Sequence, residues 1–108
     1  MNKYTELSDS EINKAVFHKA KIKHKYFRFL PNGVITYNIK GKYQVFDPCN
    51  NPSDAMPIIN EYGISLIYQD RKFQFATNDG NIECCIANPL KAAMIIFLCM
   101  KDAENEKV

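Results

Sequence analysis

Near the C-terminus, the pattern of apolar and polar positions predicts one helix from Asn88 to Asp102. Residues 92–100 are apolar without a break, and a helix that is apolar on nearly every side needs neighbours on nearly every side. Asn88 is a suitable N-cap because its side-chain oxygen can accept a backbone N–H of the first turn. Pro89 suits the first helical position, where its missing N–H costs nothing. We therefore expect the rest of the chain to pack around this helix.

An amphipathic pattern predicts a second helix near the N-terminus. Ser8 and Glu11 have the spacing of a capping box, so the helix is expected to begin at Ser8 or Ser10. Apolar residues such as Ile12 and Val16 recur at helical spacing until about residue 20. This helix is expected to lie on the core with one face in water.

Short aromatic and β-branched runs, separated by residues that favour turns, predict two groups of antiparallel strands. The predicted strands are 26–30, 34–39, 43–46, 64–68, 72–76 and 82–86. Pro-Asn-Gly and Lys-Gly sequences in the first group favour tight reversals of the chain. The strands of each group are therefore expected to follow one another as a meander.

Residues 47–63, which join the two groups, predict a loop and a short helix. Asn51 and Ser53 are both possible N-caps. With Asn51 as the cap, Pro57 would remove a hydrogen bond inside the helix. With Ser53 as the cap, Pro57 is the fourth helical residue, whose N–H has no partner in any case. We therefore predict that Ser53 caps this helix and that Gly63 ends it.

The resulting order, α-βββ-α-βββ-α, predicts an α+β fold in which an antiparallel sheet packs against a buried C-terminal helix. The chain of 108 residues is long enough for one domain with a modest core. We expect a single domain over residues 1–108, with a frayed polar tail at residues 103–108.

Two Asn-Pro segments resemble the small phage family that is named after the Nin-region protein X of lambda-like phages. The residues that carry the resemblance are Asp47, Pro48, Asn51, Pro52, Pro57, Asn88 and Pro89. The similarity runs from the first predicted helix to the last. It implies a phage or prophage origin and the cytoplasm of a bacterial host, but no activity, because the family is otherwise labelled a domain of unknown function.

Charge is unevenly distributed along the chain. Residues 1–48 hold nine Lys or Arg against four Asp or Glu, whereas residues 49–108 hold five against eight. The candidate partner-binding residues are Lys19, Lys21, Lys23, Lys25 and Arg28. Because the four lysines alternate with other residues, they would share one face of an extended strand, so we predict residues 19–25 to be extended. With the neighbouring aromatic residues, segment 19–29 is a candidate nucleic-acid site; alternatively, the lysines keep an edge strand soluble.

Candidate catalytic chemistry is sparse. The cysteines lack the spacing of a zinc site, and the isolated glycines fit turns rather than a phosphate-binding loop. We expect reduced thiols, no metal and no cofactor. Cys49 precedes a predicted helix, whose dipole can lower a thiol pKa, and Asp47 is nearby. A small enzyme around these two residues is therefore a third hypothesis, although no residue is marked that would orient a base for Cys49.

These observations favour a non-enzymatic protein-interaction module that modulates a host or defence protein. Nucleic-acid binding through segment 19–29 is the alternative. Apolar surface left over on helix 88–102 would suit a homodimer interface. The polar N-terminus has no secretory signal, and no apolar run reaches the roughly 20 residues needed to cross a bilayer. We therefore expect the host cytoplasm and no membrane.

Overall fold

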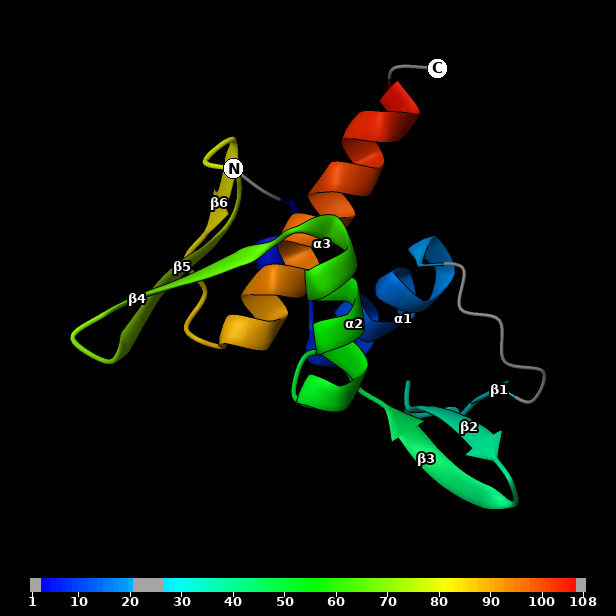
Figure 1. The fold of residues 1–108 in the computed structure, drawn as a ribbon. Helices are drawn as coiled ribbons and strands as arrows, with labels where there is room; N and C mark the ends of the chain where they lie inside the picture. The colour runs from blue at the N-terminus through cyan, green and yellow to red at the C-terminus, as the bar shows by residue number, and fades with distance from the viewer. Residues whose placement is uncertain (1–2, 21–26, 107–108) are drawn as a thin grey trace.

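The computed structural model describes residues 3–20 and 27–106 (Figure 1). The helical elements are η1 (Lys3–Glu6), a short 3₁₀ helix, α1 (Asp9–Lys19), α2 (Pro52–Tyr62) and α3 (Pro89–Glu106). The strands are β1 (Phe27–Phe29), β2 (Ile35–Ile39), β3 (Lys42–Phe46), β4 (Ser65–Gln69), β5 (Lys72–Asn78) and β6 (Ile82–Cys84). This order confirms the predicted α+β class and the alternation of helices with two groups of three strands.

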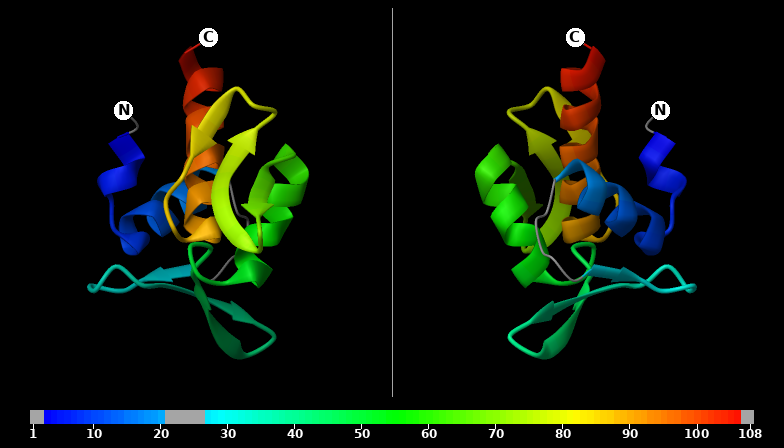
Figure 2. Two further views of the ribbon diagram at one scale, coloured as in Figure 1. Left: turned by 90° about the vertical axis from the view of Figure 1, so that its left-hand side faces the viewer. Right: turned by 90° about the vertical axis from the view of Figure 1, so that its right-hand side faces the viewer.

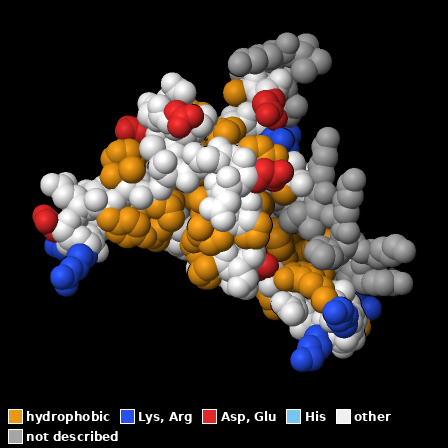
Figure 3. All heavy atoms as spheres, viewed as in Figure 1, with side chains coloured by type: hydrophobic (Ala, Val, Ile, Leu, Met, Phe, Trp, Pro, Cys, Tyr) orange, Lys and Arg blue, Asp and Glu red, His pale blue; other side chains and the backbone are white. Residues whose placement is uncertain are grey.

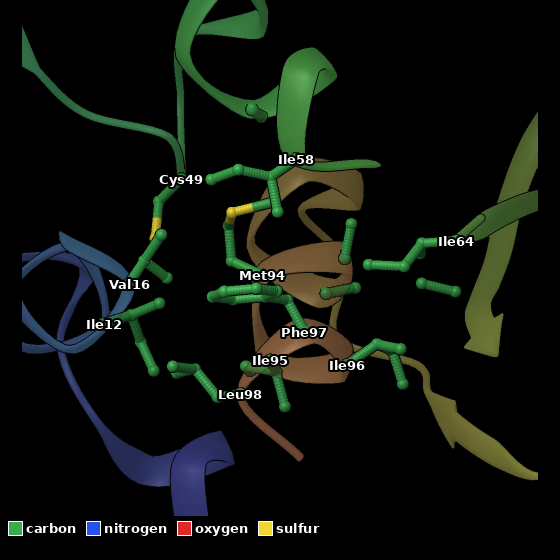
Figure 4. Close-up of a cluster of buried hydrophobic side chains, with 14 of the residues drawn as sticks. Ile12, Val16, Cys49, Ile58, Ile64, Met94, Ile95, Ile96, Phe97 and Leu98 are labelled. Atoms are coloured by element: carbon green, nitrogen blue, oxygen red, sulfur yellow. The ribbon is translucent and has the colours of Figure 1, made fainter. Parts of the chain in front are cut away.

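Helix α3 forms the centre of the molecule. Helices α1 and α2 and the sheet of β4–β6 pack around it, as the two side views of Figure 2 show. Residues 92–98 have no exposed surface at all. Figure 4 shows side chains from α1, α2 and the loop before α2 converging on those of α3. This confirms the prediction that the rest of the chain packs around the C-terminal helix on nearly every side.

The six strands form two separate antiparallel sheets, in the orders β1-β2-β3 and β4-β5-β6. The second sheet packs directly on α3, whereas the first lies at one end of the molecule (Figure 1). Phe17 of α1 holds the first sheet through ring contacts with Phe27 at 4.1 Å and Phe46 at 6.0 Å between centroids. The predicted antiparallel sheet is thus divided in two, and each half packs on a different part of the helical core.

Two of the hairpins close through two-residue turns in which both residues have positive φ. These residues are Lys40 (52°) with Gly41 (84°) between β2 and β3, and Asp70 (53°) with Arg71 (68°) between β4 and β5. Such turns match the right-handed twist of the strands that they connect. They make both hairpins tight and let their strands extend away from the core.

The predicted start of α2 is wrong, because Asn51 and not Ser53 is the N-cap. The side chain of Asn51 accepts the N–H of Ser53 at 3.0 Å, and Pro52 occupies the first helical position. The helix continues through Pro57, which leaves the Ser53 carbonyl without a helical N–H. Ser53 and Pro57 both lie on the exposed side, where water can satisfy that carbonyl. Gly63 ends the helix at φ 64°, as predicted.

The C-terminal helix is longer than predicted, since α3 runs to Glu106 instead of fraying after Asp102. The Tyr4 hydroxyl donates to Asp102 at 2.5 Å, and Lys101 pairs with Glu104 at 3.2 Å. These contacts hold an additional helical turn beyond the apolar core.

Candidate functional site

The two Asn-Pro segments that carry the family resemblance meet in space. The Asn88 Oδ1 accepts the N–H of Leu90 at 3.0 Å, which confirms that Asn88 caps α3. The Nδ2 of the same side chain donates to the Cys49 carbonyl at 2.7 Å and to the Asn50 Oδ1 at 3.2 Å. One side chain therefore both starts α3 and fixes the loop that leads into α2.

A buried residue of α1 completes this connection. The Asn13 Nδ2 donates to the Asp47 Oδ1 at 2.7 Å, and the Asn13 Oδ1 accepts the Cys49 N–H at 3.1 Å. The Asp47 N–H donates to the Asp54 Oδ2 at 2.9 Å. No role for Asn13 was predicted from the sequence; its one signal is that it is a polar residue beside the apolar face of the first helix. Asp47 and Asp54 here hold loop and helices together.

Asp9 links the same loop to the first turn of α3. The Asn50 Nδ2 donates to the Asp9 Oδ2 at 3.0 Å, and the Lys91 Nζ lies 3.0 Å from the Asp9 Oδ1. The hydrogen bond from Asn50, followed by that from Lys91, lowers the pKa of Asp9. The motif residues Asp47 and Asn88 therefore belong to a polar network that joins α1, α2 and α3.

Cys49 lies inside this network and has no exposed surface. Its thiol lies 3.8 Å from the Asp9 carbonyl, to which it donates. Burial, with the charges of Asp9 and Asp47 adding to it, raises the pKa of Cys49 to about 12. The expectation that a helix dipole lowers this pKa is wrong, because desolvation of the thiolate outweighs the dipole.

We predict that Cys49 resists alkylation by iodoacetamide at neutral pH, because only the thiolate reacts and Cys49 stays protonated. Cys85 is exposed and should be the first thiol to react in the folded protein, whereas Cys84 is buried. Peptide mapping by mass spectrometry after a timed reaction measures both. A Cys85→Ser variant is the control, and rapid labelling of Cys49 in that variant would contradict the prediction.

The first sheet belongs to the half of the chain in which Lys and Arg outnumber Asp and Glu. Residues 12–46 contain no Asp or Glu. On the described part of this segment Arg28, Lys40 and Lys42 are exposed. Figure 3 shows Lys and Arg side chains gathered where the β2–β3 hairpin extends from the body. This end of the molecule is therefore positively charged.

One face of the first sheet points away from the core. Ile35 and Phe46 are buried, so their neighbours along the strands point outward. The outward side chains, which we call the hairpin face, are Arg28, Thr36, Asn38, Tyr43 and Val45. Tyr43 is 70% exposed and Val45 is 51% exposed. The hairpin face thus combines an aromatic and an aliphatic side chain with nearby positive charge.

A cleft of about 310 Å³ lies on the other side of this sheet, between it and α2. Its walls are Ala20, Tyr37, Ile39, Phe46, Ser53, Asp54, Pro57, Ile58 and Glu61. The Tyr37 hydroxyl donates to the Asp54 Oδ1 at 3.3 Å, and burial raises the pKa of Tyr37. The cleft therefore has apolar walls and two carboxyl groups, in contrast with the basic hairpin face.

The predicted basic residues fall into three groups. Arg28 lies on β1 and belongs to the hairpin face. Lys19 ends α1 and is helical, so the extended conformation predicted there is wrong. The Ala20 N–H still donates to the Val16 carbonyl at 2.8 Å, which shows that the helical hydrogen bonding continues past Lys19. Lys21, Lys23 and Lys25 lie outside the described residues.

Within residues 3–20 and 27–106, no group of three or more His, Cys, Asp or Glu side chains could hold a metal ion. No helix in this part of the chain is long and apolar enough to cross a membrane. Fold and surface define a small α+β domain whose helices are joined by a polar network and whose first sheet carries exposed basic side chains.

The chain belongs to the phage NinX family: residues 3–101 match the family described as "Bacteriophage P22, NinX". This confirms the resemblance carried by the two Asn-Pro segments. No curated protein and no solved structure matches the chain.

Proposed function

We propose that this phage protein is a non-enzymatic interaction module that binds a host or defence protein in the bacterial cytoplasm through the hairpin face. The observation that carries the proposal is the exposure of Tyr43 and Val45 on a face of a regular sheet that also carries Arg28, two strands away. Tyrosine and arginine are enriched among the residues that dominate binding energy in interfaces. The sheet holds them in place before any partner arrives, so little ordering entropy opposes binding.

The charge around the hairpin face indicates the chemistry of the partner. Lys40 and Lys42 lie at the turn that closes the hairpin, and Arg28 lies on the opposite edge strand. A complementary surface would have an apolar centre for Tyr43 and an acidic rim. Complementary charge chiefly accelerates association and selects the partner, so binding should weaken as the ionic strength rises.

The test is affinity capture from host lysate with the wild-type protein and with a Tyr43→Ser, Val45→Ser double variant. We expect the partner that the wild type retains to be reduced at least about tenfold by the double variant, as for the loss of an interface hot spot. Met56→Ser, which removes an exposed apolar side chain from α2, is the matched control and should retain the partner. Equal capture by all three proteins would rule out the hairpin face.

Nucleic-acid binding is the second candidate, and a specific observation favours it. Residues 12–46 lack acidic side chains, and Tyr43 is exposed on the same face as Arg28, where its ring could stack on a base. Capture that disappears on nuclease treatment would identify a nucleic acid as the ligand. Its affinity should then fall steeply with salt, and Arg28→Glu with Lys40→Glu and Lys42→Glu should reduce that slope. A separate variant with Lys21, Lys23 and Lys25 replaced by Glu tests, by the same binding measurement, whether the lysines of segment 19–29 contribute.

A further inference from the structure

Strand β4 is an edge strand without the usual protection. Within the second sheet it pairs with β5 on one side, and none of its residues Ser65–Gln69 is charged. Edge strands normally carry charged side chains, which oppose pairing with another chain. The other described edges follow this rule, with Arg28 in β1, Lys42 in β3 and Glu83 in β6. The absence of charge from β4 therefore distinguishes it.

The sequence of β4 is symmetric in polarity about its central residue. It reads Ser-Leu-Ile-Tyr-Gln, which is polar at both ends and apolar at the three positions around Ile67. Ile67 is 37% exposed and Tyr68 is 53% exposed. Figure 3 shows apolar side chains spread over the β4–β5 hairpin, away from the basic end of the first sheet. If a second copy of β4 paired with it in antiparallel orientation, polar residues would lie opposite polar residues and apolar residues opposite apolar residues.

The backbone of β4 suits such pairing. Ile67 pairs with Phe75 and Tyr68 with Phe73, so the extra residue of the irregularity, Gln74, lies on β5. A bulge bends the strand that contains the extra residue. Since β4 has none, its residues keep a regular alternation along the free edge.

We propose that β4 pairs antiparallel with β4 of a second copy of this chain, about a twofold axis at Ile67. Each Ile67 then faces the other, and Leu66 of each copy faces Tyr68 of the other. Side chains that lie opposite each other on antiparallel strands are close enough to pack, so the apolar Ile–Ile and Leu–Tyr pairs would stabilise the contact. A twofold axis requires a surface that is complementary to itself, and the polarity of β4 meets that condition. The β4–β6 sheets of the two copies then form one continuous sheet of six strands.

This dimer differs from one formed through α3. Residues 92–98 of α3 are completely buried by the chain's own elements and offer no surface to a second copy. The dimer also leaves the hairpin face free, because that face belongs to the first sheet. Each dimer would present two hairpin faces, which strengthens binding to a partner with repeated sites.

The first test measures molecular mass by sedimentation equilibrium over roughly a hundredfold range of concentration, because dimerisation follows mass action. The wild type should change from monomer to dimer with rising concentration. Ile67→Lys places two lysines face to face and should remain monomeric, while Val45→Lys on the edge strand of the other sheet should dimerise as the wild type does. A monomeric wild type throughout, or an Ile67→Lys protein that still dimerises, would overturn the proposal.

A second measurement does not depend on the folding of a lysine variant. In a Cys85→Ser background, which removes the exposed thiol, Ile67→Cys places two thiols on the twofold axis. Opposed residues of antiparallel strands have Cα atoms about 4.5–5.5 Å apart, within reach of a disulfide. Mild oxidation should cross-link Ile67→Cys into dimers much faster than Val45→Cys. Equal cross-linking of the two variants would count against pairing at β4.

Discussion

Phe97→Ala should lower the free energy of unfolding by about 3–5 kcal/mol, the cost of removing a buried aromatic side chain from a packed core. Phe97 lies in the fully buried part of α3, and its ring meets that of Tyr62 edge-on with 4.9 Å between centroids. The α1, α2 and second-sheet contacts of α3 prevent the space from closing without loss of other packing. Small domains have total stabilities of roughly 5–15 kcal/mol, so the variant should be close to unfolding at room temperature.

Urea denaturation followed by circular dichroism measures this effect. Tyr43→Ala is the control, because it removes an aromatic ring that is 70% exposed and should change stability by no more than about 0.5 kcal/mol. The stability loss of Phe97→Leu should lie between those of Phe97→Ala and Tyr43→Ala, since leucine fills part of the space left by the ring. A Phe97→Ala protein as stable as Tyr43→Ala would show that α3 is not packed as described.

Asn88→Ala should cost about 2–4 kcal/mol, more than the roughly 1 kcal/mol of an ordinary N-cap. The substitution removes the acceptor for the Leu90 N–H and also the donor to the Cys49 carbonyl. Cys49 is buried, and a buried polar group left without its partner costs about 1–3 kcal/mol. The two losses should add because they concern different atoms of one side chain.

The second Asn-Pro cap provides the matched comparison. Asn51→Ala removes the acceptor for the Ser53 N–H on α2, so about 1 kcal/mol is expected. Asn88→Ser keeps a cap but cannot reach the Cys49 carbonyl, and should recover only about the 1 kcal/mol of the cap relative to Asn88→Ala. Equal losses for Asn88→Ala and Asn51→Ala would show that the link from α3 to the loop contributes nothing.

Local sequence determined the positions of the helices and strands. The capping box of Ser8 and Glu11 is formed as predicted, with hydrogen bonds of 3.0 and 3.2 Å between the two residues. Asn88 with Pro89 starts α3, and the continuous apolar run at 92–100 identified the core helix. These predictions hold because caps, turns and helical periodicity depend on residues only a few positions apart.

The predicted start of α2 was wrong because two local preferences compete there. At α2, the cost of Pro57 inside a helix was set against the preference of Asn51-Pro52 for a helix start. The structure shows that the cap and the proline at the first position prevail. Pro57 has no N–H to donate to the Ser53 carbonyl, and this carbonyl lies on the exposed side of the helix. Only the packing of α2 shows which side of the helix is exposed.

Chain-wide packing decided the surfaces that matter for function. Val45 and Ile67 are as apolar as the core residues Ile35 and Phe46, and Tyr43 has a large aromatic ring, yet all three are exposed. The alternation along a strand shows that its two faces differ, but it does not show which face will be covered or whether six strands form one sheet or two. The contact of Asn88 with the Cys49 carbonyl, and the burial that raises the pKa of Cys49, likewise depend on residues distant in sequence. The sequence by itself therefore determined the elements, the central helix and the family, while only the tertiary structure decided the polar network, the hairpin face and the open edge of β4, because burial depends on contacts summed over the whole folded chain.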